Sequence, residues 1–202
     1  GIRCVGAFLD SEKLSRRPDV LRSMTEGSAI KFLKAYEAVC DEHFPEEVKN
    51  AWSVLEEFGP DLLIVSQLLI TLGMFYSHIH RVPMILSTLQ LMVQTTEHAP
   101  LGMCGGKRLP LGLNRLLWRG LCSMYLRGEM KKAKVIEKIL HMDLSEQKRV
   151  VRKYSKRMLK GKTPGLHLYG VSPSLVKVPK DVKMNDQVIM TGWMTINKDE
   201  QE

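Results

Sequence analysis

Two short apolar runs in the middle of the chain enclose a segment of helical length. The first run, residues 61–66, follows Gly59-Pro60, and the second covers residues 84–88. Residues 67–80 between them have the length and spacing of a helix. Because both runs are continuously apolar, they are typical of parallel strands that helices cover on both faces. The pattern therefore predicts a strand–helix–strand unit.

The flanking segments predict further helices and strands. Apolar residues recur at helical spacing across residues 28–58, where Ser28 is a plausible N-cap and Pro45 is expected to divide the stretch into two helices. Further helices are predicted over 114–125, 129–141 and 145–159, and short strands over 2–7, 166–171 and 187–192. This alternation predicts an α/β, Rossmann-like fold with a mainly parallel sheet flanked by helices.

Charge is concentrated in one segment. The 202 residues carry a net charge of +8, and residues 127–162 hold 13 of the 30 Lys and Arg but only 4 of the 22 acidic residues. Such a segment is either a solvated face or a surface for anionic lipid head groups. The candidate contacts are Lys131, Lys132, Arg152 and Lys156. Aromatic residues that could stack on bases are sparse there, so a nucleic-acid partner is not expected.

Other signals narrow the class of protein. The four cysteines form no CxxC pair, so we expect reduced thiols and no metal site. No apolar run approaches the roughly 18 residues of a membrane span. The composition therefore predicts a cytoplasmic globular domain, with at most peripheral contact with a membrane.

Four segments occur in a recognisable order. They are residues 27–33 (GSAIKFL), 61–66 with 82–85 (DLLIVS and VPMI), 111–118 (LGLNRLLW), and 168–181 with 188–193 (LYGVSPSLVKVPKD and VIMTGW). Together they resemble the N-terminal, acceptor-side domain of glycosyltransferase family 28 and its sterol glucosyltransferase relatives. The last segment is the most specific, because many folds share the strand–helix–strand unit.

The resemblance implies an incomplete GT-B N-terminal domain over residues 1–195, without its first βα units, and a linker or tail over 196–202. It also implies transfer of a hexose, such as glucose, from a UDP-sugar to a sterol or other lipid. The donor would bind a C-terminal domain outside this chain, so these residues would bind no cofactor and would be inactive alone. Val182 stands where the family has Trp, and Ser66-Gln67 stand where some relatives have a catalytic Asp.

Ligands of open parallel sheets bind beyond the carboxyl ends of the strands. This rule and the resemblance point to the same acceptor-binding residues, Ser66, Gln67, Thr88, Gln90 and Ser172, although helix capping would explain each one singly. An apolar acceptor pocket would draw on Met84, Leu86, Leu89, Leu91, Met92 and Met103, which core packing would explain equally well. The catalytic base is not identified, and His98, in the long loop over 97–110, is the candidate.

Two alternatives remain open. The chain could be a non-catalytic α/β binding module that uses the basic helices over 127–162 for anionic lipid or RNA. It could also be an accessory protein that keeps only the lipid-binding half of such an enzyme.

Overall fold

The computed structural model describes residues 6–7, 12, 16–26, 29–89, 91–100, 109–163, 165–172, 174 and 176–192. The chain forms two compact units. One, the helical unit, is Gly1–Pro60 with Lys131–Leu144, and the other, the sheet unit, is Asp61–Met130 with Ser145–Glu202. The single acceptor-side domain over 1–195 stays a prediction, and residues 193–202 lie outside the described part.

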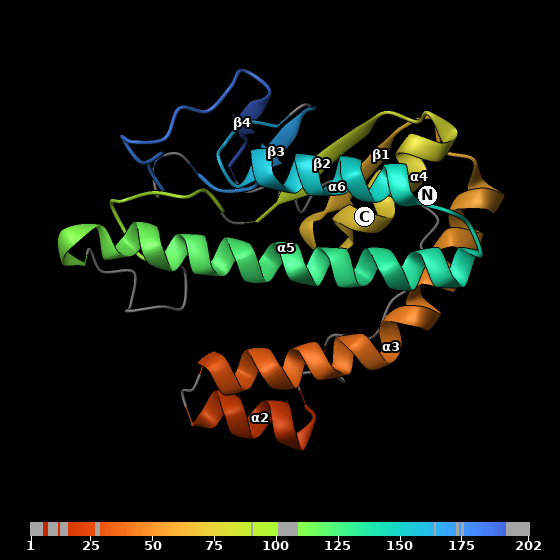
Figure 1. Ribbon diagram of the computed structural model, residues 1–202, viewed down its shortest axis with the longest axis horizontal. Helices are drawn as coiled ribbons and strands as arrows, with labels where there is room; N and C mark the ends of the chain where they lie inside the picture. Colours follow the sequence, from red (N-terminus) through yellow and green to blue (C-terminus); the bar gives the residue numbers. More distant parts are fainter. Residues whose placement is uncertain are drawn as a thin grey trace, which may run out of the picture. The chain divides into compact units, whose positions relative to one another are not determined.

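The sheet unit is built on four parallel strands in the order β1-β2-β3-β4 (Figure 1). The strands are β1 (Leu63–Ser66), β2 (Met84–Thr88), β3 (His167–Tyr169) and β4 (Val188–Met190). Each pairs in parallel with the next in the sequence. The predicted α/β, Rossmann-like fold with a parallel sheet is therefore confirmed, and both C-terminal strands join the predicted strand–helix–strand unit.

Helices pack against this sheet. A short 3-10 turn, η1 (Gln67–Leu69), leads into α4 (Ile70–His80), which connects β1 to β2 and packs against α6 (Ser145–Met158). Residues 70–76 of α4 are all buried. Gly73 permits this close packing, because a Cβ atom there would lie 2.6 Å from Cγ2 of Val65. The helix thus lies directly on β1.

One face of β1 is not covered. Leu63 and Val65 are buried, whereas Ile64 between them is 67% exposed. The expectation that helices cover both faces is wrong for this strand. The reason is that β1 ends the described sheet and its side chains alternate between a covered and an open face.

A single helix, α5 (Leu113–Leu140), replaces the two helices predicted over 114–125 and 129–141. It follows the 3-10 turn η3 (Pro110–Gly112) and contains Gly120 and Gly128. The predicted break is wrong because a glycine inside a helix costs only about 1 kcal/mol relative to alanine, too little to end a helix.

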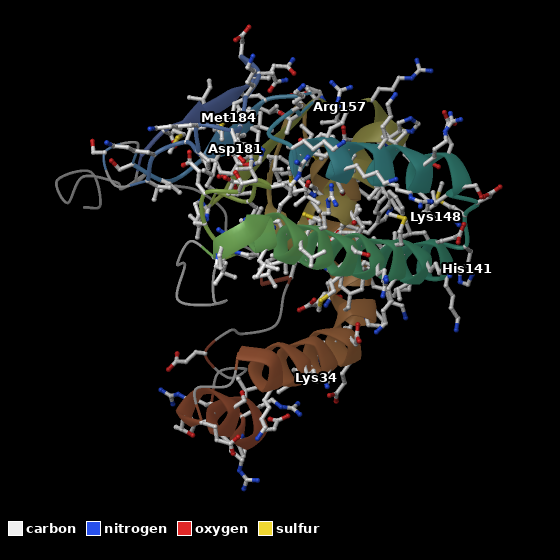
Figure 2. The ribbon with its side chains drawn as sticks, turned by 60° about the vertical axis from the view of Figure 1, so that its left-hand side comes forward. Lys34, His141, Lys148, Arg157, Asp181 and Met184 are labelled. Carbon is white, nitrogen blue, oxygen red and sulfur yellow. The ribbon has the colours of Figure 1, made fainter. Side chains whose placement is uncertain are left out.

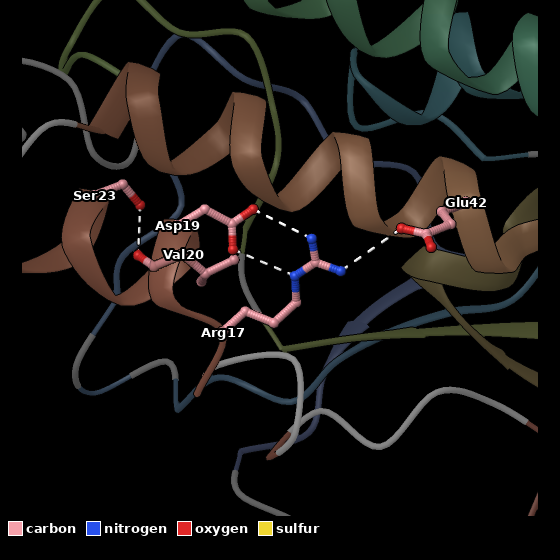
Figure 3. A network of polar contacts seen from close by, with 5 residues as sticks. All are labelled: Arg17, Asp19, Val20, Ser23 and Glu42. Carbon is pink, nitrogen blue, oxygen red and sulfur yellow. Dashed lines mark hydrogen bonds and ion pairs between the residues drawn. The ribbon is translucent and has the colours of Figure 1, made fainter.

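In the helical unit, α2 (Pro18–Thr25) packs against α3 (Ala29–Phe58). The guanidinium of Arg17 lies 3.3 Å from Oδ1 of Asp19 and 3.6 Å from Oε2 of Glu42 (Figure 3). Ser23 donates a hydrogen bond to the carbonyl of Val20 at 2.6 Å. The Arg17–Glu42 pair joins the start of α2 to the middle of α3, and the other contacts are local to α2.

Pro45 lies inside α3 and does not divide it, so the predicted break is wrong. Proline removes one N–H donor and fixes a φ value that a helix tolerates, so a long helix can continue past it with a bend. Figure 1 shows α3 changing direction along its length. The predicted N-cap Ser28 and most of the predicted strand over 2–7 fall outside the described residues, and Gly6 and Ala7 are not in a strand.

Candidate functional site

The carboxyl ends of the strands collect polar residues, as the sequence predicts. Ser66 ends β1, Gln67 follows it, Thr88 ends β2, and Ser172 lies three residues beyond β3. Because the strands are parallel, these positions belong to one edge of the sheet. Gln90 lies outside the described residues.

These residues differ in their contacts. Ser66 is exposed, and its side chain does not cap η1. Gln67 is half-buried and donates a hydrogen bond from Nε2 to the sulfur of Met92 at 2.8 Å. The hydroxyl of Ser172 accepts a hydrogen bond from the backbone N–H of Ser174 at 3.3 Å, which is the structural role that capping chemistry predicts.

Thr88 is buried and pairs with a histidine that the sequence analysis did not consider. Its hydroxyl lies 3.0 Å from Nε2 of His167, the first residue of β3. His167 is 1% exposed, and its Nδ1 has no hydrogen-bond partner among the described residues. Burial lowers the pKa of His167 from 6.5 to about 4, so the ring is neutral at neutral pH.

Three tyrosine hydroxyls are buried in the sheet unit. Tyr125 projects from α5, Tyr154 from α6 and Tyr169 from the end of β3. None of the three hydroxyls has a hydrogen-bond partner in the described part of the chain. Burial raises the pKa of Tyr154 to about 12 and raises the pKa values of Tyr125 and Tyr169 well above the ordinary value. All three therefore stay protonated and can donate a hydrogen bond.

A buried carboxylate lies four residues after Tyr125 in α5. Glu129, in α5, is 2% exposed and accepts a hydrogen bond from the hydroxyl of Thr71 in α4. Burial is the largest cause of the raised pKa of Tyr125, and the negative charge of Glu129 is the second. The side-chain amide of Gln67 lowers the pKa of Tyr125 and so offsets part of this increase. The two groups do not meet the distance and angle of a hydrogen bond.

We call these residues the tyrosine–glutamate cluster: Thr71, Tyr125, Glu129, Tyr154 and Tyr169. The cluster combines hydroxyl donors with a carboxylate acceptor inside the sheet unit. One signal in the sequence could have revealed it. Trp118, Cys122 and Glu129 are all buried, at spacings of four and seven residues, so a carboxylate occupies a position of the apolar stripe of α5. A charged residue is rarely found there unless it has partners.

Exposed apolar side chains lie at the same edge of the sheet. Leu68 follows the end of β1 and is 64% exposed, and Leu89 follows the end of β2 and is 85% exposed. Among the residues expected to line an apolar acceptor pocket, Leu86 and Leu91 are core residues instead, and Met103 lies outside the described residues. Met84 starts β2, at the opposite end of the strand. Leu89 is therefore the exposed member of that set.

The candidate base, His98, is held by local contacts. Its Nδ1 lies 3.1 Å from the carbonyl oxygen of Ala99, and its ring meets the Trp118 ring edge-on. The indole N–H of Trp118 donates a hydrogen bond to the His98 carbonyl at 3.0 Å. These contacts position the segment, and a catalytic role for His98 stays a prediction.

Asp181, from the most specific segment of the resemblance, joins the β3–β4 connection to the segment after β2. Thr95 donates a hydrogen bond to its Oδ1 at 2.6 Å, and the backbone N–H and hydroxyl of Thr96 donate to its Oδ2 at 2.7 and 2.8 Å. Desolvation alone would raise the pKa of Asp181, but these hydrogen bonds outweigh it and lower the pKa. Asn114 donates to the Thr96 carbonyl at 3.1 Å. Two segments of the resemblance therefore contact the same short stretch, residues 95–96.

The basic residues divide between the two units. Lys131, in the helical unit, pairs with Asp41, and Lys132 lies 6.0 Å from the Phe44 ring centroid. Arg152 and Lys156 lie on α6 in the sheet unit, exposed and without an ion pair to any described residue.

The exposed face of α6 is basic from Arg149 to the end of the helix. Val151, Tyr154, Ser155 and Met158 are its buried residues. The residues exposed on it from position 149 onward are Arg149, Arg152, Lys153, Lys156 and Arg157. Figure 2 labels Arg157 and Lys148 on this helix, and Asp181 and Met184 in the β3–β4 connection. We call the five exposed residues the α6 basic face.

Three further features bear on the chemistry. Among the described helices, none combines the length and apolar character needed to cross a bilayer. The described residues contain no group of three or more His, Cys, Asp or Glu side chains that could hold a metal ion. Cys122 is a free, buried thiol, and burial raises its pKa.

Comparison of the chain with protein-family models, with curated protein sequences and with solved structures gave no match.

Proposed function

We propose that this chain is the acceptor-binding part of a UDP-sugar-dependent glycosyltransferase that transfers a hexose to a hydroxyl of a sterol or another lipid. Such a transfer needs a site that holds the acceptor, a base for its proton and groups that stabilise the leaving diphosphate. In this proposal the described residues supply the first of these, at the cytoplasmic surface of a membrane. The UDP-sugar is held by residues beyond this chain.

One observation carries the proposal. Leu68 and Leu89 expose large apolar side chains where β1 and β2 end, at the sheet edge where polar groups are gathered and ligands of such sheets bind. A lipid alcohol needs this combination, because its apolar body requires an apolar surface and its hydroxyl requires polar partners. The fold class supports the same assignment, and so do the contacts by which Asp181 and Asn114, from two segments of the resemblance, both hold residues 95–96.

A titration with a fluorescent sterol, dehydroergosterol, tests this proposal. We expect saturable binding that Leu89→Asp weakens at least tenfold. The matched control is Leu62→Asp, since Leu62 is 47% exposed but immediately precedes β1, at the opposite edge. Both variants add one charge at an exposed position, so folding should be preserved in each. Absence of saturable binding, or equal weakening by the two substitutions, would contradict the proposal.

The α6 basic face favours a second, compatible role, contact with an anionic membrane surface. Each unpaired Lys or Arg near such a surface contributes about 1 kcal/mol of attraction. Such a contact would bring the acceptor-binding edge to the membrane in which a lipid acceptor is dissolved. If the chain has no part in sugar transfer, the same face would serve the alternative function of a non-catalytic binding module.

A further inference from the structure

We propose that the turn at the end of α6 binds a group that carries several phosphates. Four exposed cations belong to this site: Arg157 in the last turn of α6, Lys160 and Lys162 just after the helix, and Lys183 in the β3–β4 connection (Figure 2). We call these four residues the basic turn. They come before β3 and β4 in the chain, at the amino edge of the sheet, so the inference does not depend on the acceptor-binding edge.

Hydrogen bonds fix the backbone of the turn. The N–H groups of Lys160 and Lys162 both donate to the carbonyl of Arg157 at 3.0 Å, and the N–H of Gly161 donates to the carbonyl of Met158 at 2.8 Å. Gly161 has a φ of +69°, the left-handed conformation that commonly ends a helix and that glycine adopts without strain. The two lysines are therefore held on either side of a fixed glycine.

The β3–β4 connection packs on this turn. Side-chain carbons of Val182 and Met184 lie 3.2 and 3.3 Å from the position that a Cβ atom on Gly161 would take. The backbone N–H of Asn185 donates to the Gly161 carbonyl at 3.3 Å. Lys183 lies between the two residues that contact the turn, and unlike them it is exposed. The contact therefore brings a third lysine to the turn from a separate segment.

Acidic residues are scarce around the basic turn. Residues 147–180 contain ten Lys and Arg and no Asp or Glu. Asp181 already accepts hydrogen bonds from two threonines, so Asp186 is the remaining acid close to Lys183 in the sequence. Within the described part of the chain, no cation of the basic turn forms an ion pair. The turn therefore keeps a net positive charge.

The helix dipole explains only part of this charge. Cations near the carboxyl end of a helix are favoured by the carbonyl groups exposed there, which accounts for Arg157 and Lys160. Lys162 and Lys183 lie beyond the helix. Like charges gathered at one turn repel one another, and a bound anion replaces this repulsion with attraction. The arrangement is thus suited to a ligand with more than one negative charge.

Phosphate monoesters match this chemistry. Each carries about −1.5 to −2 charges at neutral pH and offers three acceptor oxygens, to which lysine and arginine donate. Several phosphates on one small ring, as in an inositol phosphate, can engage cations from both segments at once. The same chemistry occurs in a free inositol phosphate and in the headgroup of a phosphoinositide lipid. The diphosphate released in sugar transfer is a different ligand, because the acceptor binds at the opposite edge of the sheet.

Calorimetric titration of the chain with inositol trisphosphate, at about 0.15 M salt, tests the proposal. We expect saturable binding, which Lys160→Ala, Lys162→Ala and Lys183→Ala combined should weaken at least tenfold. The matched control removes three exposed lysines of the helical unit, Lys34, Lys49 and Lys134, in the same way. Inositol trisphosphate should also raise the Tm of the wild type and the control, but not that of the basic-turn variant.

Vesicles identify the source of the phosphates. Vesicles that contain phosphatidylinositol bisphosphate are compared with phosphatidylserine vesicles of equal surface charge. A preference for the first that free inositol trisphosphate reverses supports the proposal with a lipid headgroup as the ligand. Saturable binding of inositol trisphosphate without this preference supports it with a soluble ligand.

Three results would overturn the proposal. They are no saturable binding of inositol trisphosphate, equal weakening by the two triple variants, and tighter binding of a single-stranded oligonucleotide than of inositol trisphosphate. Binding of dehydroergosterol should be the same in the basic-turn variant and the wild type, because the acceptor edge lies at the other end of the strands. The two proposals can therefore fail independently.

Discussion

The hydroxyl of Thr71 donates a hydrogen bond to the carboxylate of Glu129, and both residues are almost completely buried. They are 58 positions apart in the sequence, one in α4 and the other in α5. This contact joins α5 to α4 inside the sheet unit. A buried charge is tolerated only where donors compensate for its loss of water, so Thr71 is a structural requirement of the cluster.

Thr71→Val should destabilise the protein by about 1–3 kcal/mol, because valine keeps the shape and removes a donor to a buried carboxylate. Thr71→Ser keeps the hydroxyl and should cost less. Urea unfolding at neutral pH measures both changes. Equal stability of the valine variant and the wild type would show that the carboxylate does not need this hydrogen bond.

Buried His167 makes stability depend on pH. Its pKa is 6.5 when unfolded and about 4 in the folded protein, so the unfolded state binds the proton more tightly. The free energy of unfolding is therefore highest above pH 6.5 and decreases as the pH falls toward 4. The total decrease is about 3 kcal/mol. An NMR titration of the ring resonances should give a midpoint well below 6. A midpoint near 6.5 would show that the ring is in contact with water.

Close packing of α4 on β1 predicts opposite effects for two glycines. Gly73→Ala should destabilise the protein by about 1–3 kcal/mol, because the new methyl group would lie 2.6 Å from a methyl carbon of Val65. Gly120→Ala in α5 meets nothing within 4 Å and should stabilise the helix by up to about 1 kcal/mol. Thermal unfolding of the two variants should therefore shift the Tm in opposite directions, and a raised Tm for both would contradict this packing.

The α6 basic face should govern binding to anionic vesicles. Arg152→Glu combined with Lys156→Glu should weaken co-sedimentation with phosphatidylserine-containing vesicles more than tenfold at 0.1 M salt. Lys34→Glu combined with Lys49→Glu is the matched control, with the same change in net charge at exposed positions of α3. Equal loss with both pairs would indicate an effect of net charge alone. Binding to vesicles of neutral lipid that equals binding to anionic vesicles would rule out the electrostatic contact.

The sequence pattern predicted the strands and α4 because continuous apolar runs and helical spacing are local signals. It failed where tertiary packing outweighs local preference. Pro45 and Gly128 lie inside continuous helices. The free-energy cost of either residue is smaller than the free energy that the surrounding helical turns gain. The tyrosine–glutamate cluster could not be predicted as a unit, since its members come from four elements that only the fold brings together. Thr88 and Gln67 were found at the sheet edge because strand polarity alone places them there.

Photolabelling with a diazirine-bearing cholesterol analogue locates a bound lipid along the chain, so it shows whether the carboxyl edge of the sheet binds the acceptor. We expect labelled peptides that contain Leu68 and Leu89, with labelling suppressed by excess unlabelled cholesterol. Labelling confined to residues 18–58, or labelling that cholesterol does not suppress, would contradict it.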